Sequence, residues 1–564
     1  MSAQADLAFV GGAVYTVDAV HPWAEAVAVR DGRIEAVGTG RDVREACGPA
    51  TQIVDLAGRM LLPAFQDAHV HASAGGLDRA TRVDLSESHS LEDYARIVRA
   101  YAERAPNAPW ILGAGWSLDM FPGGVPTRGQ LDAIVPDRPA FLLNRDHHGA
   151  WANSRALQLA GVDASTPDPV DGRVERSGDG EPIGTLQEGA MSLVERVIPP
   201  VEAADRERGV LAAQEYLHAL GISAWQEAIV GDAYAGIPDC FDAYRAVDGK
   251  GELTGRVVAS LWLRRGVPLA DQIEGFRERR ALAEEDPAGR FRASTVKIMY
   301  DGVCENFTAA MLEPYLGSGA DASGGRGLTY FDPGDIRDWV VRLDAEGFQP
   351  HFHAIGDRGV RDALDAVEAA RRANGTSDTR PHVAHIQVVH PDDRPRFRAL
   401  GVSANAQMLW AQMDAQLTDL TIPFLGEPRS DWMYPFGSLL AHGAQLAAGS
   451  DWPISTADPL QQMHVGVNRA APPGYAFATE EGDAAGALLP HERITLQSAI
   501  AAFTAGSAFV NHLDETGVIR PGAIADLVVL DRNLFAHPAD EVGSARVDMT
   551  FVDGRLVYER AGGA

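Results

Sequence analysis

Cysteine is scarce in this sequence, and its spacing gives no sign of a cross-link. The 564 residues include three cysteines, Cys47, Cys240 and Cys304, which lie far apart and form no Cys-x-x-Cys pair. This argues against a disulfide framework and against a zinc site built from thiolates, and it fits a reducing compartment.

Positive charge and long apolar runs are also in short supply. Lysine and arginine together number 49 against 78 aspartates and glutamates, a formal charge of −29, which excludes a nucleic-acid binder that works through a basic surface. No apolar run reaches the roughly 18 residues that a membrane span needs. Residues 1–6 have neither the basic nor the apolar region of a secretory signal. We therefore expect a cytoplasmic protein with no membrane partner.

A regular alternation fills most of the chain. Short apolar runs alternate with helical stretches rich in Ala, Leu and Arg, such as 91–105, 205–220 and 335–346, which is typical of beta-alpha units around a parallel sheet. Polar residues end the expected strands, which are 66–71, 294–300, 349–353, 382–385, 402–405 and 445–451. Because a (β/α)8 enzyme builds its site at the carboxyl ends of its strands, the pattern predicts an α/β fold with a TIM-like barrel.

The two ends of the chain resemble each other. Residues 25–37 and 549–558 each read as a hairpin around an Asp-Gly turn, and 525–530 as a buried strand. Since domain ends often meet in space, we expect 1–61 and 456–564 to form one small β-sandwich and 62–455 to form the barrel. The stretch 85–200, richer in Gly, Pro and Trp, is expected to be an insertion over the barrel mouth.

Several residues with the chemistry of metal ligands follow the expected strands. His69 and His71 are two positions apart, so on a strand both imidazoles point to one side and can reach one ion, although such a pair is as easily structural. Lys297 ends an apolar run, where burial lowers the pKa of its amine and makes it nucleophilic, unless the side chain reaches the rim. His353, His385 and Asp451 end three more strands.

Seven separated motifs resemble the amidohydrolase superfamily, in particular its YtcJ-like branch, which includes N-substituted formamide deformylases. The motifs cover nearly the whole chain and lie at 63–71, 148–157, 184–188, 296–302, 353–358, 385–387 and 449–453. The resemblance implies that His69, His71 and Asp451 bind one metal, that His353 and His385 bind a second, and that carboxylated Lys297 bridges the two.

Imidazoles and hard oxygens suit Zn2+, in one or two copies, and leave other divalent metals open. The implied reaction is hydrolysis of an amide C–N bond, in an N-acyl or N-substituted amide, by metal-bound hydroxide, with Asp451 as the proton shuttle. His351 shares a strand face with His353, and His382 lies on the same expected strand as His385, so the residues alone do not choose within either pair.

Other residues are candidates for substrate contact. His148, which matches a motif of the family, is a catalytic candidate, and the adjacent His147 is an equally plausible donor to the substrate. The further substrate-binding candidates are Trp116, Asn405 and Trp452, with packing or rim hydrogen bonds as their alternative roles. Aromatic residues in loops suggest a substrate with an apolar or aryl portion. The sequence leaves the roles of Cys304 and Glu305 open.

Two other functions remain open. A deaminase of a cyclic amidine or nucleobase would share the superfamily, but His353 lacks a nearby His-x-x-Glu pattern and Lys297 is present, which favours amide hydrolysis. A non-catalytic scaffold would have no need of six retained ligand candidates. The expected partner is a small-molecule substrate, with a homodimer as the default assembly.

Overall fold

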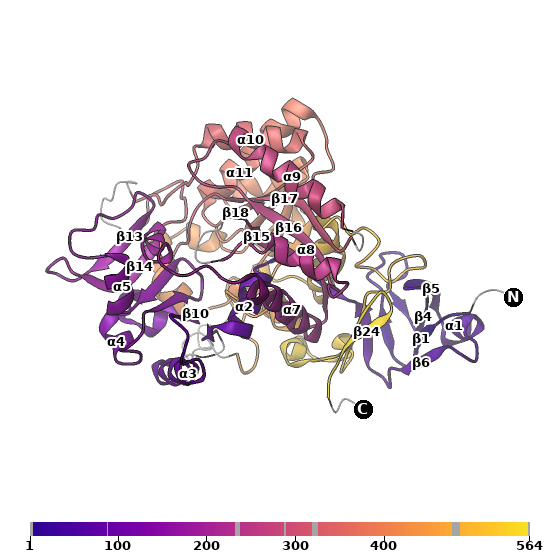
Figure 1. Cartoon of the computed structure of the whole chain (residues 1–564). Helices are drawn as coiled ribbons and strands as arrows, with labels where there is room; N and C mark the ends of the chain where they lie inside the picture. The colour runs from indigo at the N-terminus through magenta and orange to yellow at the C-terminus, as the bar shows by residue number, and fades with distance from the viewer. Residues whose placement is uncertain are drawn as a thin grey trace.

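The centre of the computed structural model is a barrel of eight parallel strands (Figure 1). The structure describes residues 4–86, 88, 90–231, 237–286, 289–317, 325–475 and 486–561. The strands follow one another around the barrel in chain order: β8 (Phe65–Val70), β15 (Ile222–Val230), β16 (Arg256–Trp262), β17 (Phe291–Met299), β18 (Gln349–Ala354), β19 (His382–His385), β20 (Ser403–Ala406) and β21 (Leu446–Ala448). The first and last strands meet where the Asp451 amide donates to the carbonyl of His69 at 2.8 Å.

Helices connect successive strands on the outside of the barrel. They include α8 (Phe241–Gly249), α9 (Ile273–Glu284), α10 (Pro333–Ala345), α11 (Asp357–Asn374), α12 (Arg394–Leu400) and α14 (Phe436–Ala441). Local sequence sets their ends: Asp332 caps α10 through its side chain and is followed by Pro333 in the first turn. In α11 the apolar positions Val360, Leu364 and Val367 fall on one buried face.

An additional sheet replaces the first barrel connection. Between α2 (Ala72–Thr81) and α7 (Ala203–Ala219) lies a sheet in the order β13-β14-β12-β11-β10-β9, whose strands are Gly172–Arg176, Pro182–Glu188, Gly149–Ala152, Ala140–Asn144, Ile111–Trp116 and Val83–Asp84. It also carries α3 (Leu91–Arg104), α4 (Arg128–Asp132) and α5 (Ser154–Ala160), and it lies on the left of Figure 1. Helices α2 and α7 pack closely because Gly76 has no Cβ, which would meet the Gly209 carbonyl oxygen at 2.0 Å.

Two further sheets contain the chain ends. One has the order β5-β4-β1-β6, with strands Arg33–Gly38, Ala26–Arg30, Leu7–Val10 and Gln52–Asp55. The other, β24-β23-β22-β7-β2-β3, joins Arg555–Glu559, Val547–Val552 and Leu527–Leu530 to Met60–Pro63, Ala13–Tyr15 and Trp23–Ala24. A shared apolar core that includes Phe9, Leu61 and Phe551 connects the two sheets.

The predicted fold class is confirmed, with its barrel and its additional β sheets. The domain limits stay a prediction; α18 (Ser507–Val510), beyond residue 456, packs against β8 and β21. In the part of the chain that the structure describes, no helix combines the length and apolar character needed to cross a membrane.

Candidate active site

Six side chains from different strand ends line one cavity in the mouth of the barrel. His69 lies on β8 and His71 directly follows it; Lys297 comes from β17, His353 from β18, His385 from β19, and Asp451 from the segment after β21. All six are buried, with exposed fractions of 7% or less. These are the residues to which the sequence assigned metal binding, and the parallel barrel brings them together because its strands share one direction.

The backbone is held in an unusual conformation at several of these positions. His385, Asp451 and His147 have φ values of 79°, 59° and 61°, in the left-handed region that residues other than glycine seldom occupy. Each such residue costs on the order of 1 to 3 kcal/mol and persists only where the surrounding structure holds it. At His385 and Asp451 the turn lies directly after a barrel strand, where it directs the side chain into the mouth.

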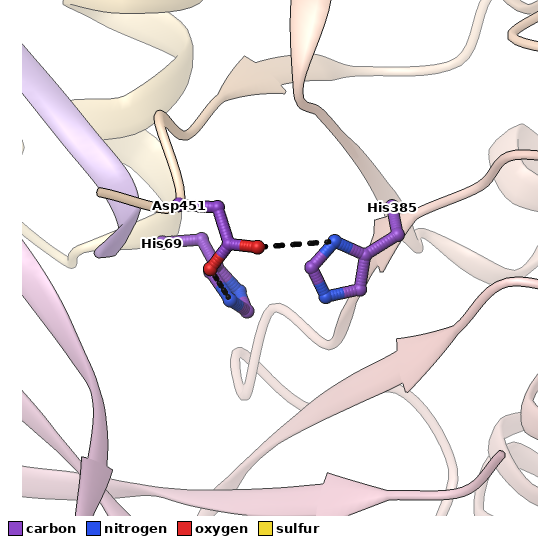
Figure 2. A group of neighbouring side chains, drawn as sticks. All are labelled: His69, His385 and Asp451. Carbon is purple, nitrogen blue, oxygen red and sulfur yellow. Dashed lines mark ion pairs between the residues drawn. The ribbon is translucent and has the colours of Figure 1, made fainter. Parts of the chain in front are cut away.

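Asp451 lies between His69 of β8 and His385 of β19 (Figure 2). Its Oδ1 is 3.1 Å from Nε2 of His69 and 3.1 Å from Nε2 of His71, and its Oδ2 is 3.9 Å from Nδ1 of His385. One ligand atom from each of His69, His385 and Asp451 lies within 4.8 Å of the others, close enough for a single ion. The carboxylate is therefore shared between the His69–His71 pair and His385.

Lys297 lies beside His69 in the same cavity. Its Nζ is 3.4 Å from Nε2 of His69. The ring centres of His353 and His385 are 4.4 Å apart, and those of His69 and His385 are 4.7 Å apart. His385 is therefore close to both His69 and His353.

Several polar atoms of this group have no hydrogen-bond partner within the described part of the chain. They are Nδ1 of His71 and both ring nitrogens of His385, all buried. Buried polar atoms are nearly always satisfied, so these nitrogens point to a ligand that the protein chain does not supply. A divalent cation fits this donor set, since imidazole nitrogen and carboxylate oxygen are ordinary ligands of zinc and related metals.

Burial sets the protonation of the ligands. The pKa values of His69, His353 and His385 lie well below the ordinary 6.5, first because the rings are desolvated and then because of the neighbouring cationic groups. Burial also lowers the pKa of Lys297 to about 7, against a smaller opposing effect of Asp451. At pH 7 the imidazoles are therefore neutral, and about half of the Lys297 amine is neutral, so these nitrogens offer the free lone pairs that metal binding requires.

Polar groups behind the ligands orient their rings. Nε2 of His351 is 2.7 Å from Nδ1 of His69, and Nδ1 of His351 is 2.9 Å from the Ser260 hydroxyl. Oδ1 of Asp301 is 3.3 Å from Nδ1 of His353. Contacts of this kind fix the ring orientation of metal-binding histidines. Of the two histidines on β18, His353 therefore lines the cavity and His351 supports His69.

His148 reaches the same cavity from the additional sheet. Its Nδ1 is 2.9 Å from Oε1 of Glu188, and its ring centre is 5.8 Å from that of His353. Burial lowers the pKa of His148, but the charge and hydrogen bond of Glu188, with Asp146, outweigh it and raise the pKa to about 9. The adjacent His147 also lines the cavity, and its pKa falls to about 3, mainly through burial.

The three remaining candidates for substrate contact lie outside this cavity. Trp116 is fully buried in the core of the additional sheet, where its Nε1 donates to the Leu142 carbonyl at 2.8 Å. Asn405 is fully buried and donates to the carbonyl of Ala68 on β8 at 2.9 Å. Trp452 packs on Tyr216 of α7, with ring centres 4.8 Å apart. Each has its polar or aromatic surface occupied by the protein itself.

Sequence reasoning assigned no role to some residues that shape the site. Asp301 lies two residues after the end of β17, the strand that carries Lys297. A carboxylate just after such a strand was the signal available in the sequence. Trp410 stacks on the His385 ring, with ring centres 5.2 Å apart and an interplanar angle of 4°. Cys304 is buried in the apolar core and does not line the cavity.

Comparisons with known proteins agree with this geometry. The Amidohydrolase family profile matches residues 52–558. The protein LONG AFTER FAR-RED 3 of Arabidopsis thaliana is 32% identical over 98% of this chain and 92% of its own length. An N-substituted formamide deformylase of Arthrobacter pascens is 28% identical over the full length of both chains. A crystal structure described as an uncharacterized metal-dependent hydrolase of Pyrococcus furiosus superimposes with a TM-score of 0.69, at 26% identity, over 93% of this chain and 99% of the other.

The profile match spans most of the chain and includes every residue of the candidate site. The family resemblance that the sequence motifs indicated is confirmed, together with its hydrolase fold. The chain is a hydrolase that belongs to the amidohydrolase family.

Proposed function

We propose that this protein is a metal-dependent hydrolase of the C–N bond in a non-peptide amide, with an N-acyl or N-substituted amide as the substrate. The observation that carries the proposal is the cluster of six buried ligand candidates around one cavity at the carboxyl ends of the barrel strands. The formamide deformylase, similar over its full length, supports the choice of an amide.

We assign the metal ligands to two groups. His69 and His71 would hold one ion with Asp451, and His353 and His385 would hold a second. Lys297 would supply the bridging group as a carbamate, for which a buried amine with a pKa of about 7 provides a neutral nucleophile. Zinc is the metal we expect. A bound divalent cation acidifies water and polarises a carbonyl oxygen.

The remaining chemistry belongs to the chain. The Asp451 carboxylate, 3.1 Å from two histidine nitrogens, takes the proton of the attacking water and delivers it to the leaving nitrogen. His148, protonated through its contact with Glu188, donates to the substrate oxygen as negative charge develops there. His147 is neutral and contacts the substrate from the same loop.

The test is elemental analysis of the purified protein combined with hydrolysis of a panel of N-formyl and N-acetyl amides. Two metals per chain and amide cleavage that a chelator abolishes and zinc restores support the proposal. One metal with ammonia release from cyclic amidines instead indicates a deaminase, and a metal-free chain without turnover indicates a scaffold. Incubation with 13C-labelled carbon dioxide should give one carbamate signal in wild type and none in Lys297→Met.

A further inference from the structure

A second chamber lies beside the metal cavity. The two cavities share Asp146 and four apolar residues that we call the apolar collar: Val303, Ile355, Trp410 and Ile454. Trp410 stands at the boundary, because its ring stacks on the metal-ligand candidate His385. The apolar side chains of Val303, Ile355, Trp410 and Ile454 therefore form a wall that is common to both cavities.

The far wall of the second chamber is polar. It is lined by Arg145, Glu305, Gln387, Asp414, Gln416 and Tyr434. Gln387 is 2% exposed, and its Nε2 has no hydrogen-bond partner in the described part of the chain. An amide donor buried to this degree without an acceptor costs about 1 to 3 kcal/mol, which an incoming acceptor recovers.

The charge of the chamber limits which acceptor fits. One guanidinium, Arg145, stands against the three carboxylates Asp146, Glu305 and Asp414, a formal charge of −2. The Arg145 guanidinium is already close to Gln416, with NH2 3.4 Å from its Oε1. Glu305 accepts a hydrogen bond from the Thr421 hydroxyl at 2.8 Å. An anionic group would meet net repulsion here, whereas an uncharged oxygen acceptor would not.

We infer that the second chamber binds an uncharged polar tail of the substrate, with Gln387 Nε2 donating to a carbonyl or hydroxyl oxygen of that tail. The inference rests on the proposed function for the amide end of the substrate and deepens it. The substrate class is then an amide with an apolar or aryl middle that fits the collar and a neutral polar end. Gln387 is in this view a specificity-determining residue.

The experiment compares hydrolysis of N-acyl arylalkylamines that carry a carboxamide, an isopropyl group or a carboxylate at the far end of the ring. Each compound is made in two forms, with the substituted ring on the amine side of the amide or on its acyl side. In wild type we expect kcat/KM to be about tenfold higher for the carboxamide than for the isopropyl compound, in line with one recovered hydrogen bond. The carboxylate should be the poorest of the three. Equal values for all three compounds would overturn the inference.

Two variants of Gln387 separate recognition from folding. Gln387→Leu should abolish the carboxamide preference, so that the ratio of kcat/KM for the carboxamide to that for the isopropyl compound falls to about one. Gln387→Glu should prefer a tail ending in an aminomethyl group, a gain that a misfolded protein would not show. The matched control is Glu195→Gln, in a different cleft between the additional sheet and the barrel, where Oε1 of Glu195 is also buried without a partner in the described chain. A preference that follows Glu195 rather than Gln387 would contradict the inference.

A binding measurement keeps this inference separate from the proposed function. Calorimetry with an alkyl acetophenone, which has a carbonyl oxygen but no C–N bond to hydrolyse, reports on the chamber without turnover. Tighter binding of the acetophenone than of its isopropyl analogue, lost in Gln387→Leu, supports the inference even if no amide is hydrolysed. Equal binding refutes it even if amides are hydrolysed.

Discussion

Replacement of Lys297 by methionine should stabilise the metal-free protein while it abolishes activity. Lys297 is 1% exposed, and burial lowers the pKa of its amine from 10.5 to about 7. At pH 7 the Lys297 amine is fully protonated in the unfolded chain but only partly protonated in the folded protein. This difference lowers the free energy of unfolding by about 4 kcal/mol. Methionine has nearly the same length and no charge to desolvate, so Lys297→Met removes this cost with little change in packing.

The effect is measurable as a change in melting temperature. For 564 residues the entropy of unfolding is roughly 1.2 kcal/mol per degree, so about 4 kcal/mol corresponds to a rise of about 3 °C. The assay is calorimetry of chelator-treated protein in buffer free of carbon dioxide, which keeps the lysine an amine. Lys250, the one other lysine in the chain, gives the control: its side chain is 52% exposed, and Lys250→Met should change stability by no more than about 0.5 kcal/mol.

The pH dependence provides a second check. The pKa of Lys297 is lower in the folded protein than in the unfolded chain, so the unfolded chain binds more protons between pH 7 and 10.5. The free energy of unfolding of the wild type therefore increases as the pH rises through this range. The advantage of Lys297→Met should be complete below pH 7, shrink between pH 7 and 10.5, and vanish above that range. An unchanged or lower melting temperature at pH 7 would refute the interpretation of Lys297 as a desolvated, neutral amine.

Three further variants test other parts of the site. Asp451→Asn should lower kcat by about 10² to 10⁴-fold in steady-state assays, because a general acid–base group contributes that much, and full activity with full metal content would remove the shuttle role. The kcat/KM of wild type should fall above pH 9, where His148 loses its proton. Because Glu188 raises the pKa of His148, Glu188→Gln should move this fall in kcat/KM to lower pH. A pH profile that does not move contradicts the role assigned to His148. Trp116→Ala should lower the melting temperature through loss of about 3 to 5 kcal/mol of core packing and leave KM within about twofold, whereas a selective rise in KM would place Trp116 at the substrate.

Local patterns predicted the barrel and six of its eight strands, but β15 and β16 were not among the expected strands. Apolar runs that end in His or Lys predict strands such as β17 and β18, and the pair Asp332-Pro333 predicts the start of α10. Both signals depend on residues near one another in the chain, where a strand or helix period is visible directly. Cavity contacts escaped this reasoning: Trp116 and Trp452 look like pocket aromatics by sequence, but one lies in a sheet core and the other packs against α7.

The sequence by itself determined the family, the barrel fold and the candidate ligands that follow its strands. Only the tertiary structure decided which of these groups face one another. His351 and His353 have the same strand face and the same chemistry, yet the packing of β8 against β18 across the mouth assigns one to support His69 and the other to line the cavity. The apolar collar and the unsatisfied amide of Gln387 also arise from segments far apart in the chain. Periodicity records which way a side chain points from its own strand, whereas its partners depend on long-range packing that no local pattern contains.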